Sequence, residues 1–324
     1  HRLPRPAQHA DHGVVLVATG AYELETKEYG YGTSEAIVVQ RDLEKMIHDR
    51  DDKVGAARNV VMIQCVGSRS FERPYCSRYC CSEAIKNALK LKELDPEKDV
   101  TILYRDIRTY GLKEDFYKKA RELNVKFVRF DEERKPEVKV DGGKVTVSVF
   151  DPVMNEPVDL RADILALSVG TVPNPDNVAT GMMLKVPTNQ DGFFLEAHVK
   201  LRPVDFATDG VFMCGMSHAP KMSDETIAQA NAAVSRACTI LTKDYIESEG
   251  KTAYVNKERC MACGLCESNC PYGAVAVDMA EGCAVVNSVL CKGCGVCTAS
   301  CRMNAIDLNG FNNEEVLAQI SSAI

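Results

Sequence analysis

The sequence of 324 residues has no long apolar run and no N-terminal apolar segment of the kind that directs secretion. An uninterrupted apolar run such as 14–18 is much shorter than the roughly 18 residues that a membrane-spanning helix needs. The opening residues, His1 to Pro6, lack the apolar core of a signal peptide. We therefore expect a chain that has no membrane span and is not secreted.

The chain also lacks a strong excess of charge and the short motifs of common hydrolases. Its 39 lysine and arginine residues against 46 aspartate and glutamate residues leave a net charge of −7, which gives no global electrostatic reason to bind nucleic acid or anionic lipid. The six histidines form no HExxH pattern, and neither a GxSxG elbow nor a Walker loop is present. Hydrolysis is therefore not the chemistry that the sequence indicates.

Cysteine is abundant and clustered. Of fifteen cysteines, nine lie in 260–301 and four in 65–81. A chain of this length buries a core without disulfide cross-links, and clustered cysteines are typical of metal or iron–sulfur ligation in a reducing compartment. The pattern predicts a cytoplasmic iron–sulfur protein. Three cysteines outside the motifs, Cys214, Cys238 and Cys283, are expected to be packing residues.

The C-terminal cysteines form two C-x2-C-x2-C-x3-C runs at an offset of about 31 residues. This repeat resembles a bacterial-type two-cluster ferredoxin, in which three cysteines of one run hold a cluster and the fourth holds the other cluster. The resemblance implies two crossed ligand sets: Cys260, Cys263, Cys266 and Cys301, and Cys291, Cys294, Cys297 and Cys270. Pro271 follows the first run, but Arg302 stands at the matching place in the second. A four-thiolate zinc site is the alternative, which two complete runs disfavour.

Upstream, strand-like and helix-like segments alternate along about 240 residues. Short apolar or alternating runs predict strands, and amphipathic runs predict helices. The expected strands are 13–18, 59–64, 100–104, 125–129, 145–150 and 164–168, and the expected helices are 82–94, 114–123 and 224–241. This alternation predicts an α/β fold whose sheet is mostly parallel and covered by helices.

Three glycine-containing fragments of this region, 17–20, 167–174 and 208–215, resemble flavoproteins with two dinucleotide-binding domains, the thioredoxin-reductase-like fold. Taken singly, each fragment is compatible with an ordinary buried strand that ends in a glycine turn. The resemblance implies FAD, with the N-terminus of helix 224–241 directed at the flavin ring and Ser223 as its N-cap. It also implies a set of cofactor-binding residues: Thr19, Gly20, Gly170, Asp209, Gly215, Lys221 and Ser223.

Two glycine loops that this fold uses are missing. No G-x-G-x-x-G that would hold the FAD pyrophosphate precedes 13–20, so we expect the FAD site to be completed by another polypeptide or by a missing N-terminal region. After 59–64, where an NAD(P)-binding loop is expected, the sequence continues with the run Cys65–Arg69 instead. A stand-alone NAD(P)H-dependent oxidoreductase is therefore disfavoured.

A third cysteine group stands in place of the second loop. Its spacing, C-x10-C-x3-C-C, supplies enough thiolates for one [4Fe–4S] cluster: Cys65, Cys76, Cys80 and Cys81. Four thiols without a metal are the alternative. Together with 104–111 and 198–221, this group closely resembles the A subunit of heterodisulfide reductase, and the resemblance runs from 13 to 306. It matches roughly the C-terminal two thirds of that family's pattern.

The resemblance divides the chain into four parts. Residues 1–25 would end the first part of the FAD domain, and 26–172 would form an inserted NAD-domain-like βα unit that carries a cysteine cluster. Residues 173–245 would return to the FAD domain, and 252–312 would form an α+β ferredoxin domain with two [4Fe–4S] clusters.

The resemblance implies an oxidoreductase subunit that transfers electrons between FAD and three [4Fe–4S] clusters by flavin-based electron bifurcation. Lys86 is then the candidate catalytic residue, because a cation beside the isoalloxazine would stabilise an anionic reduced flavin. From the residues alone, Lys86 is a solvated helix lysine. The implied partners are heterodisulfide-reductase-like B and C subunits, an electron-input module of the hydrogenase, formate dehydrogenase or another type, and soluble ferredoxin. A cluster-only electron-relay or scaffold subunit without a functional flavin is the alternative.

Overall fold

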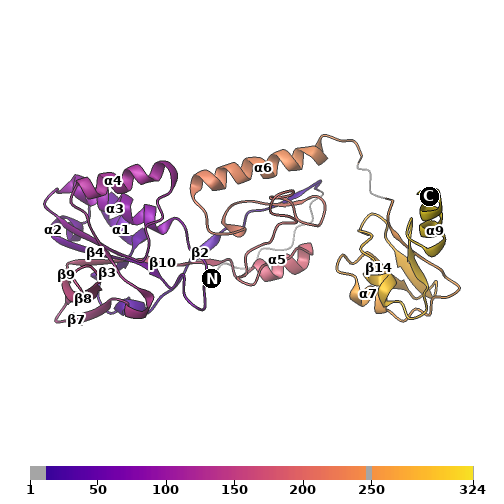
Figure 1. The fold of residues 1–324 in the computed structure, drawn as a ribbon, viewed down its shortest axis with the longest axis horizontal. Coiled ribbons are helices and arrows are strands. Elements are labelled where there is room, and N and C mark those ends of the chain that lie inside the picture. Colours follow the sequence, from indigo (N-terminus) through magenta and orange to yellow (C-terminus); the bar gives the residue numbers. More distant parts are fainter. Residues whose placement is uncertain (1–11, 246–249, 324) are drawn as a thin grey trace.

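A computed structural model of the chain describes residues 12–245 and 250–323 (Figure 1). Residues 1–11, 246–249 and 324 lie outside the described part, so the start of the expected segment 1–25 is not described. The structure consists of a sheet-containing first lobe, a second lobe around the long helix α6, and a C-terminal module (Figure 1). No helix of the described residues is long and apolar enough to cross a membrane.

A five-stranded parallel sheet with the order β3-β10-β4-β5-β6 forms the centre of the first lobe. Its strands are β3 (Ile37–Val39), β4 (Asn59–Val66), β5 (Asp99–Tyr104), β6 (Lys126–Arg129) and β10 (Ile164–Val169). Every residue of β10 is buried, as expected for a central parallel strand with both faces covered. Because the strands are parallel, the carboxyl ends of β4 and β5 lie at the same edge of the sheet.

The two faces of this sheet are covered differently, as Figure 1 shows. Val60 and Met62 of β4 belong to a core shared with the helices on one face, whereas Val61 and Ile63 belong to a core shared with an antiparallel sheet on the other. The helices are α1 (Gln40–Asp49), α2 (Asp52–Ala56), α3 (Cys80–Leu94) and α4 (Glu114–Glu122). The antiparallel strands are β7 (Glu137–Asp141), β8 (Lys144–Asp151) and β9 (Glu156–Ala162). The expected parallel sheet is present, but helices cover only one of its faces.

The chain enters and leaves the first lobe through two short strands that pair with each other. β2 (Ala21–Glu23) runs antiparallel to β11 (Thr171–Pro173). These strands lie next to the expected domain boundaries at 25/26 and 172/173. Four short 3-10 turns complete the connections of the two lobes: Glu28–Gly30, Gly111–Lys113, Glu132–Arg134 and Gly215–Ser217.

The second lobe is built around a pair of parallel strands, β1 (Val15–Val17) and β12 (Val211–Met213), which are close in space although almost 200 residues separate them. α5 (Asn177–Leu184) and α6 (Ser223–Leu241) complete this lobe. The helix expected at 224–241 starts one residue earlier, so Ser223 is its first residue and Met222 is the N-cap. The N–H of Met222 donates to Oε2 of Glu225 (2.9 Å), which closes the first turn of α6.

The C-terminal module repeats one unit twice. β13 (Ala253–Val255) pairs with β16 (Ile306–Leu308), and β14 (Val275–Asp278) pairs with β15 (Cys283–Val286). The short helices α7 (Leu265–Asn269) and α8 (Val296–Ser300) stand at equivalent places of the two halves, and α9 (Asn313–Ala323) follows. Each strand pair combines strands from both halves of the duplication, which brings the two cysteine runs together around one core.

Candidate functional site

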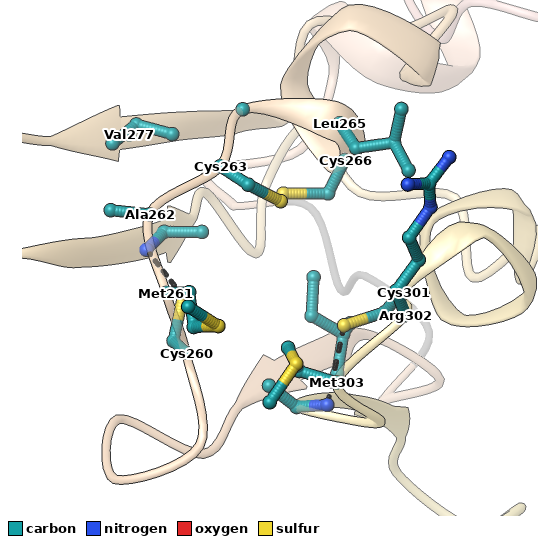
Figure 2. Close-up of a pocket in the computed structure, with 14 residues that line it drawn as sticks. Cys260, Met261, Ala262, Cys263, Leu265, Cys266, Val277, Cys301, Arg302 and Met303 are labelled. Carbon is teal, nitrogen blue, oxygen red and sulfur yellow. Dashed lines mark hydrogen bonds between the residues drawn. The ribbon is translucent and has the colours of Figure 1, made fainter.

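The C-terminal module contains two small cavities, and each is lined by four cysteines. The first is lined by Cys260, Cys263, Cys266 and Cys301, and the second by Cys270, Cys291, Cys294 and Cys297. These are the two crossed sets that the sequence implies. Figure 2 shows the first cavity, with the cysteine side chains arranged around a central space, and all four cysteines are free of disulfide bonds.

Backbone amides donate to the cysteine sulfurs at equivalent positions of both halves. Ala284 N donates to Cys260 Sγ (3.4 Å), and Ala253 N donates to Cys291 Sγ (3.3 Å). Two further amides donate to the fourth cysteines of the runs, Ala274 N to Cys270 Sγ and Ala305 N to Cys301 Sγ (both 3.3 Å). Such N–H···S hydrogen bonds stabilise the negative charge that thiolate ligands of a cluster carry.

These features test whether an iron–sulfur cluster suits the two cysteine sets. Across 12–245 and 250–323, no group of three or more His, Cys, Asp or Glu side chains is arranged to hold a single metal ion. The C-terminal thiols instead border cavities, which is the arrangement that a cluster needs, because its own iron and sulfide atoms occupy the space between the ligands. The all-thiol donor sets and the N–H···S hydrogen bonds therefore fit [4Fe–4S] clusters.

The upstream cysteines gather at the edge of the parallel sheet, at the turn from β4 to α3. Cys65 lies near the end of β4, Cys80 and Cys81 begin α3, and Cys76 lies in the connecting loop. The N–H of Arg78 donates to Cys76 Sγ (3.3 Å). A dinucleotide-binding fold places its phosphate-binding glycine loop at this turn, and here the turn carries thiols.

Burial and neighbouring groups shift the pKa values of three of these thiols, Cys65, Cys80 and Cys81. Burial is the main cause that raises the pKa of Cys65 to about 11. The hydrogen bond between the thiols of Cys80 and Cys81 raises the pKa of Cys80 and lowers that of Cys81 to about 7. Arg69 and Arg108 also lower the pKa of Cys81. Cys80 and Cys81 are buried and Cys65 and Cys76 are half-buried. Together with the cationic neighbours, this position suits an anionic thiolate-bound group.

A cavity of about 700 Å³ lies between α3, the end of β1 and the N-terminus of α6. Four of the expected flavin contacts line it, together with the candidate catalytic residue: Gly20, Gly215, Lys221, Ser223 and Lys86. Its size is in the range of small-molecule and cofactor sites. The structure therefore brings together residues from three distant segments of the chain around one space.

Three other expected flavin contacts do not line this cavity. The hydroxyl of Thr19 donates to Oδ1 of Asn177 (2.9 Å). Gly170 packs against Gly67, whose carbonyl oxygen would lie 3.0 Å from an added Cβ. The exposed Asp209 forms ion pairs with Arg202 and Lys292. The structure thus gives these residues structural partners and does not place them with the other four.

Several ionisable side chains line the cavity and determine its charge. Lys86 reaches it from α3 and forms an ion pair with Glu44. Glu83, one turn earlier, also lines it, and burial followed by repulsion from Glu23 raises the pKa of Glu83 to about 7. On the opposite side, burial followed by the charge of Arg78 lowers the pKa of Lys221 to about 8. Three lysines line this space, Lys86, Lys113 and Lys221. Together with the positive end of α6 they favour an anionic group.

The cavity also contains a polar atom without a partner. Ser82 lines this space, and its buried Oγ has no hydrogen-bond partner among the described residues. Buried polar atoms are nearly always paired, so this hydroxyl is available to a bound group. The apolar side chains of Met216, Met222 and Ile227 line the same space and suit one face of an aromatic ring. The residues present therefore fit the ring portion of a flavin.

The sequence did not identify several residues of this cavity. Glu83 could have been found, because it precedes Lys86 by three residues and so lies on the same helix face. Tyr79, Lys113 and Met216 line the cavity from separate segments, and no local pattern marks them. Only the folded chain shows that these positions meet.

Comparison with known proteins adds family information. The 4Fe-4S binding domain family (Fer4) matches residues 253–276, which confirms a ferredoxin-type domain in the C-terminal region. Among curated proteins, the A subunit of H(2):CoB-CoM heterodisulfide,ferredoxin reductase of Methanothermobacter thermautotrophicus is 37% identical over 96% of this chain and 49% of its own length. The A subunit of H(2)/formate:CoB-CoM heterodisulfide,ferredoxin reductase of Methanococcus maripaludis is 36% identical over 96% of this chain and 50% of its own length. The chain therefore spans about half the length of these relatives, less than the two thirds or so that the sequence led us to expect.

Solved structures that match part of this chain include two thioredoxin reductases. The enzyme of T. acidophilum is 18% identical, with 70% of this chain and 64% of that chain covered and a TM-score of 0.45. The enzyme of Lactococcus lactis is 17% identical, with 71% and 67% covered and a TM-score of 0.46.

Proposed function

On the premise that the chain is homologous over 96% of its length to A subunits of heterodisulfide reductases, we propose that it is a flavin- and cluster-binding electron-transfer subunit. The chain spans about half the length of these relatives. We further propose flavin-based electron bifurcation as its mode of action, within a cytoplasmic complex that contains B- and C-type subunits and an electron-input module. Soluble ferredoxin is a proposed partner of the C-terminal module.

In this proposal, the twelve clustered cysteines hold three [4Fe–4S] clusters, and the cavity between α3 and α6 holds the ring of FAD. Bound together, these groups would accept electrons in pairs at the flavin and pass them on one at a time through the clusters. The pyrophosphate of FAD would need a site outside the cavity, since these 324 residues contain no G-x-G-x-x-G loop.

The residues of the chain place and tune these groups. The first turn of α6 and the side chains of Lys86 and Lys221 supply positive charge to the cavity, which favours a reduced, negatively charged ligand. Arg78 connects the cysteine loop to α6, because it donates to the carboxylate of Glu225 (2.5 Å) and to the carbonyl of Pro220 (3.4 Å). The cysteine group and the cavity are therefore held in a fixed relation.

One observation carries the proposal: α3 serves both sites. Its first two residues are Cys80 and Cys81, and its next turn presents Glu83 and Lys86 to the cavity. A helix rises about 1.5 Å per residue, so the cysteines and Lys86 are separated by no more than about 9 Å along its axis. Electron transfer between a flavin and a cluster requires such proximity, and a single rigid helix secures it.

The proposal is tested by flavin content in the complex purified without oxygen. Thr226 lines the cavity from α6, so Thr226→Trp should fill the space and abolish FAD binding without loss of iron. Thr239→Trp on the exposed side of the same helix is the matched control and should retain FAD. A native complex that has its full iron content and electron transfer but no FAD would favour the alternative of a cluster-only electron relay. Equal FAD content in both variants would show that the flavin does not use this cavity.

A further inference from the structure

Lys221 occupies an unusual position for a lysine. It is only 8% exposed, and it lines the cavity between α3 and α6. Its Nζ donates to the carbonyl oxygen of Gly215 (3.0 Å) and to Nδ1 of His218 (3.2 Å). Both partners are neutral acceptors, and no carboxylate forms an ion pair with Lys221 among the described residues. An ammonium group has three donors, so one remains for a group in the cavity.

A hydrogen-bond network fixes which nitrogen of His218 accepts from Lys221. The N–H of Gly215 donates to Oε1 of Gln229 (2.9 Å), which orients the Gln229 amide so that its Nε2 donates to Nδ1 of His218 (3.0 Å). Since Nδ1 is an acceptor, the proton of the neutral ring is on Nε2, where it donates to Oε2 of Glu196 (2.7 Å). Glu196 and Gln229 therefore hold the imidazole in the form that accepts from Lys221.

The charges around Lys221 come from several elements. Arg78, in the loop before α3, repels the ammonium, whereas Glu225 on α6 and Glu196 attract it. Burial raises the pKa of the nearby Cys214, which keeps its thiol neutral. Both oxygens of Glu225 are engaged, by Met222 N and by Arg78, and Oε2 of Glu196 is engaged by His218. Burial is the largest cause that lowers the pKa of Lys221 to about 8, and burial also lowers the pKa of His218.

Four further ionisable groups face the same cavity from outside this network: Tyr79, Glu83, Lys86 and Lys113. Burial raises the pKa of Tyr79 to about 12, so its hydroxyl stays protonated. Lys86 and Lys113 form ion pairs with Glu44 and Asp224. Of the lysines that line the cavity, Lys221 is the one held by neutral acceptors. A lysine of this kind can lose its proton without breaking an ion pair.

We propose that Lys221 donates a proton to the ligand of this cavity when the ligand is reduced, and takes the proton back when the ligand is oxidised. This inference rests on the proposed function, which makes the ligand a flavin that receives its electrons through the proposed redox partners. One N–H bond at Nζ breaks and one N–H bond at a ring nitrogen forms, so the ammonium becomes an amine and no other atom is transferred. His218, Gln229 and Glu196 act as positioning residues, because they aim Nζ and keep their own protons.

The first test needs no flavin. The full chain is labelled with trace acetic anhydride from pH 6 to pH 11, and mass spectrometry follows the peptide that contains Lys221. We expect half-maximal reactivity of Lys221 near pH 8, well below the value of about 10.4 of an unperturbed lysine. The exposed Lys118 of α4 is followed in the same experiment as the internal reference for labelling. Glu196→Gln should lower the midpoint of Lys221 further, because it removes a negative charge. A midpoint of Lys221 in the ordinary range would overturn the proposal.

The second test separates proton transfer from a fixed charge. In the FAD-loaded complex, the midpoint potential of the flavin is measured against pH, and a change of slope near pH 8 is expected. Lys221→Arg retains the positive charge but cannot release a proton, so the change of slope should disappear while the iron content stays the same. If the arginine variant retains the change of slope, Lys221 acts only as a charge and the proposal is wrong. If no FAD binds at all, the proposed function fails, while the labelling experiment still reports how Lys221 titrates.

Discussion

At the scale of single residues, Lys86 shows how the fold changes the meaning of a side chain. In the sequence it is a lysine on an amphipathic helix, and such residues usually face solvent. In the structure it is about half-exposed, pairs with Glu44 and lines the cavity with Glu83. Its charge can therefore act on a bound group, although solvent still screens it.

We predict that Lys86→Ala leaves the iron content unchanged and lowers the one-electron potentials of the flavin, because loss of the cation destabilises a negatively charged reduced ring. For a half-exposed charge, the effect should be at most about 1 kcal/mol, and electron transfer from FAD should become uncoupled. Anaerobic redox titration of the complex measures this shift. Lys90→Ala is the matched control, because Lys90 lies on the same helix and pairs with Glu93 away from the cavity lining. Unchanged potentials and full turnover in the Lys86 variant would leave it a solvated helix lysine.

Asp205 is a residue whose importance the sequence did not reveal. Its side chain is 1% exposed, and it accepts hydrogen bonds from Arg202 and from Arg236 of α6 (both 3.0 Å). Burial alone would raise the pKa of Asp205, but the hydrogen bonds and charges of Arg236 and Arg202 outweigh burial and lower it. The ionised form is therefore stabilised in the folded state, and α6 is tied to the strand that follows Asp205.

We predict that Asp205→Ala lowers the free energy of unfolding by about 1–3 kcal/mol at pH 7, because charged hydrogen bonds to two arginines are lost. The pKa of Asp205 is lower in the folded state than in the unfolded state, where it is about 3.9. The ionised carboxylate therefore stabilises the fold at pH values above about 3.9, and this stabilisation is lost as the pH falls through the folded-state pKa. The difference from the wild type should therefore shrink below about pH 4. Urea unfolding followed by circular dichroism measures it, with the exposed Asp209→Ala as the control, which should change stability by less than about 1 kcal/mol.

At the scale of elements, the sequence predicted the strands that a run of neighbouring apolar residues marks. β4, β5, β6 and β10 lie within two residues of the expected segments. In β4, β5 and β10, mostly apolar runs mark buried parallel strands. β7 and β9 were not expected, because most of their residues are exposed and carry charge. Their place in the fold depends on β8, whose alternating apolar residues join the core beneath the parallel sheet.

The duplication of the ferredoxin module offers a prediction with an internal control. Gly293 has a φ of 59°, and a Cβ there would lie 2.1 Å from the carbonyl oxygen of Lys251. The equivalent residue of the first half is Ala262, which has a φ of 52° and carries a Cβ. Only the second half therefore requires glycine, since a main-chain carbonyl cannot easily move away.

We predict that Gly293→Ala distorts the loop between Cys291 and Cys294 and removes about four iron atoms per chain, the content of one [4Fe–4S] cluster. Ala262→Gly should retain the full iron content. Iron analysis and the electron paramagnetic resonance of the reduced protein report the number of clusters. Equal iron content in the two variants would contradict the assignment of the second cysteine set.

At the scale of the whole molecule, the two kinds of site differ in how far the sequence reveals them. The ferredoxin cysteines lie in short runs whose spacing is nearly the entire site, so the crossed sets could be written from the sequence and the structure brings them together. The cavity is built from segments near residues 20, 83 and 221, and the network of Lys221, His218 and Glu196 depends on their meeting in space. Long-range contacts of this kind leave no periodic signal in the chain.

The last prediction counts the iron of the whole chain. Three sets of four cysteines predict about twelve iron atoms per chain and little zinc in a complex purified without oxygen. The upstream set is the one that this measurement decides, because its four thiols could also be free. Cys65→Ser should lower the count to about eight, since a serine oxygen is a poor replacement for a thiolate ligand. Cys238→Ser, at an exposed position of α6, should leave it at about twelve.

About eight iron atoms in the unaltered chain, with the Cys65 group reactive toward thiol reagents, would show that the turn between β4 and α3 carries redox thiols instead of a cluster. α3 would then connect the cavity to a thiol group, and electron transfer from the cavity would have to reach the ferredoxin module by another route.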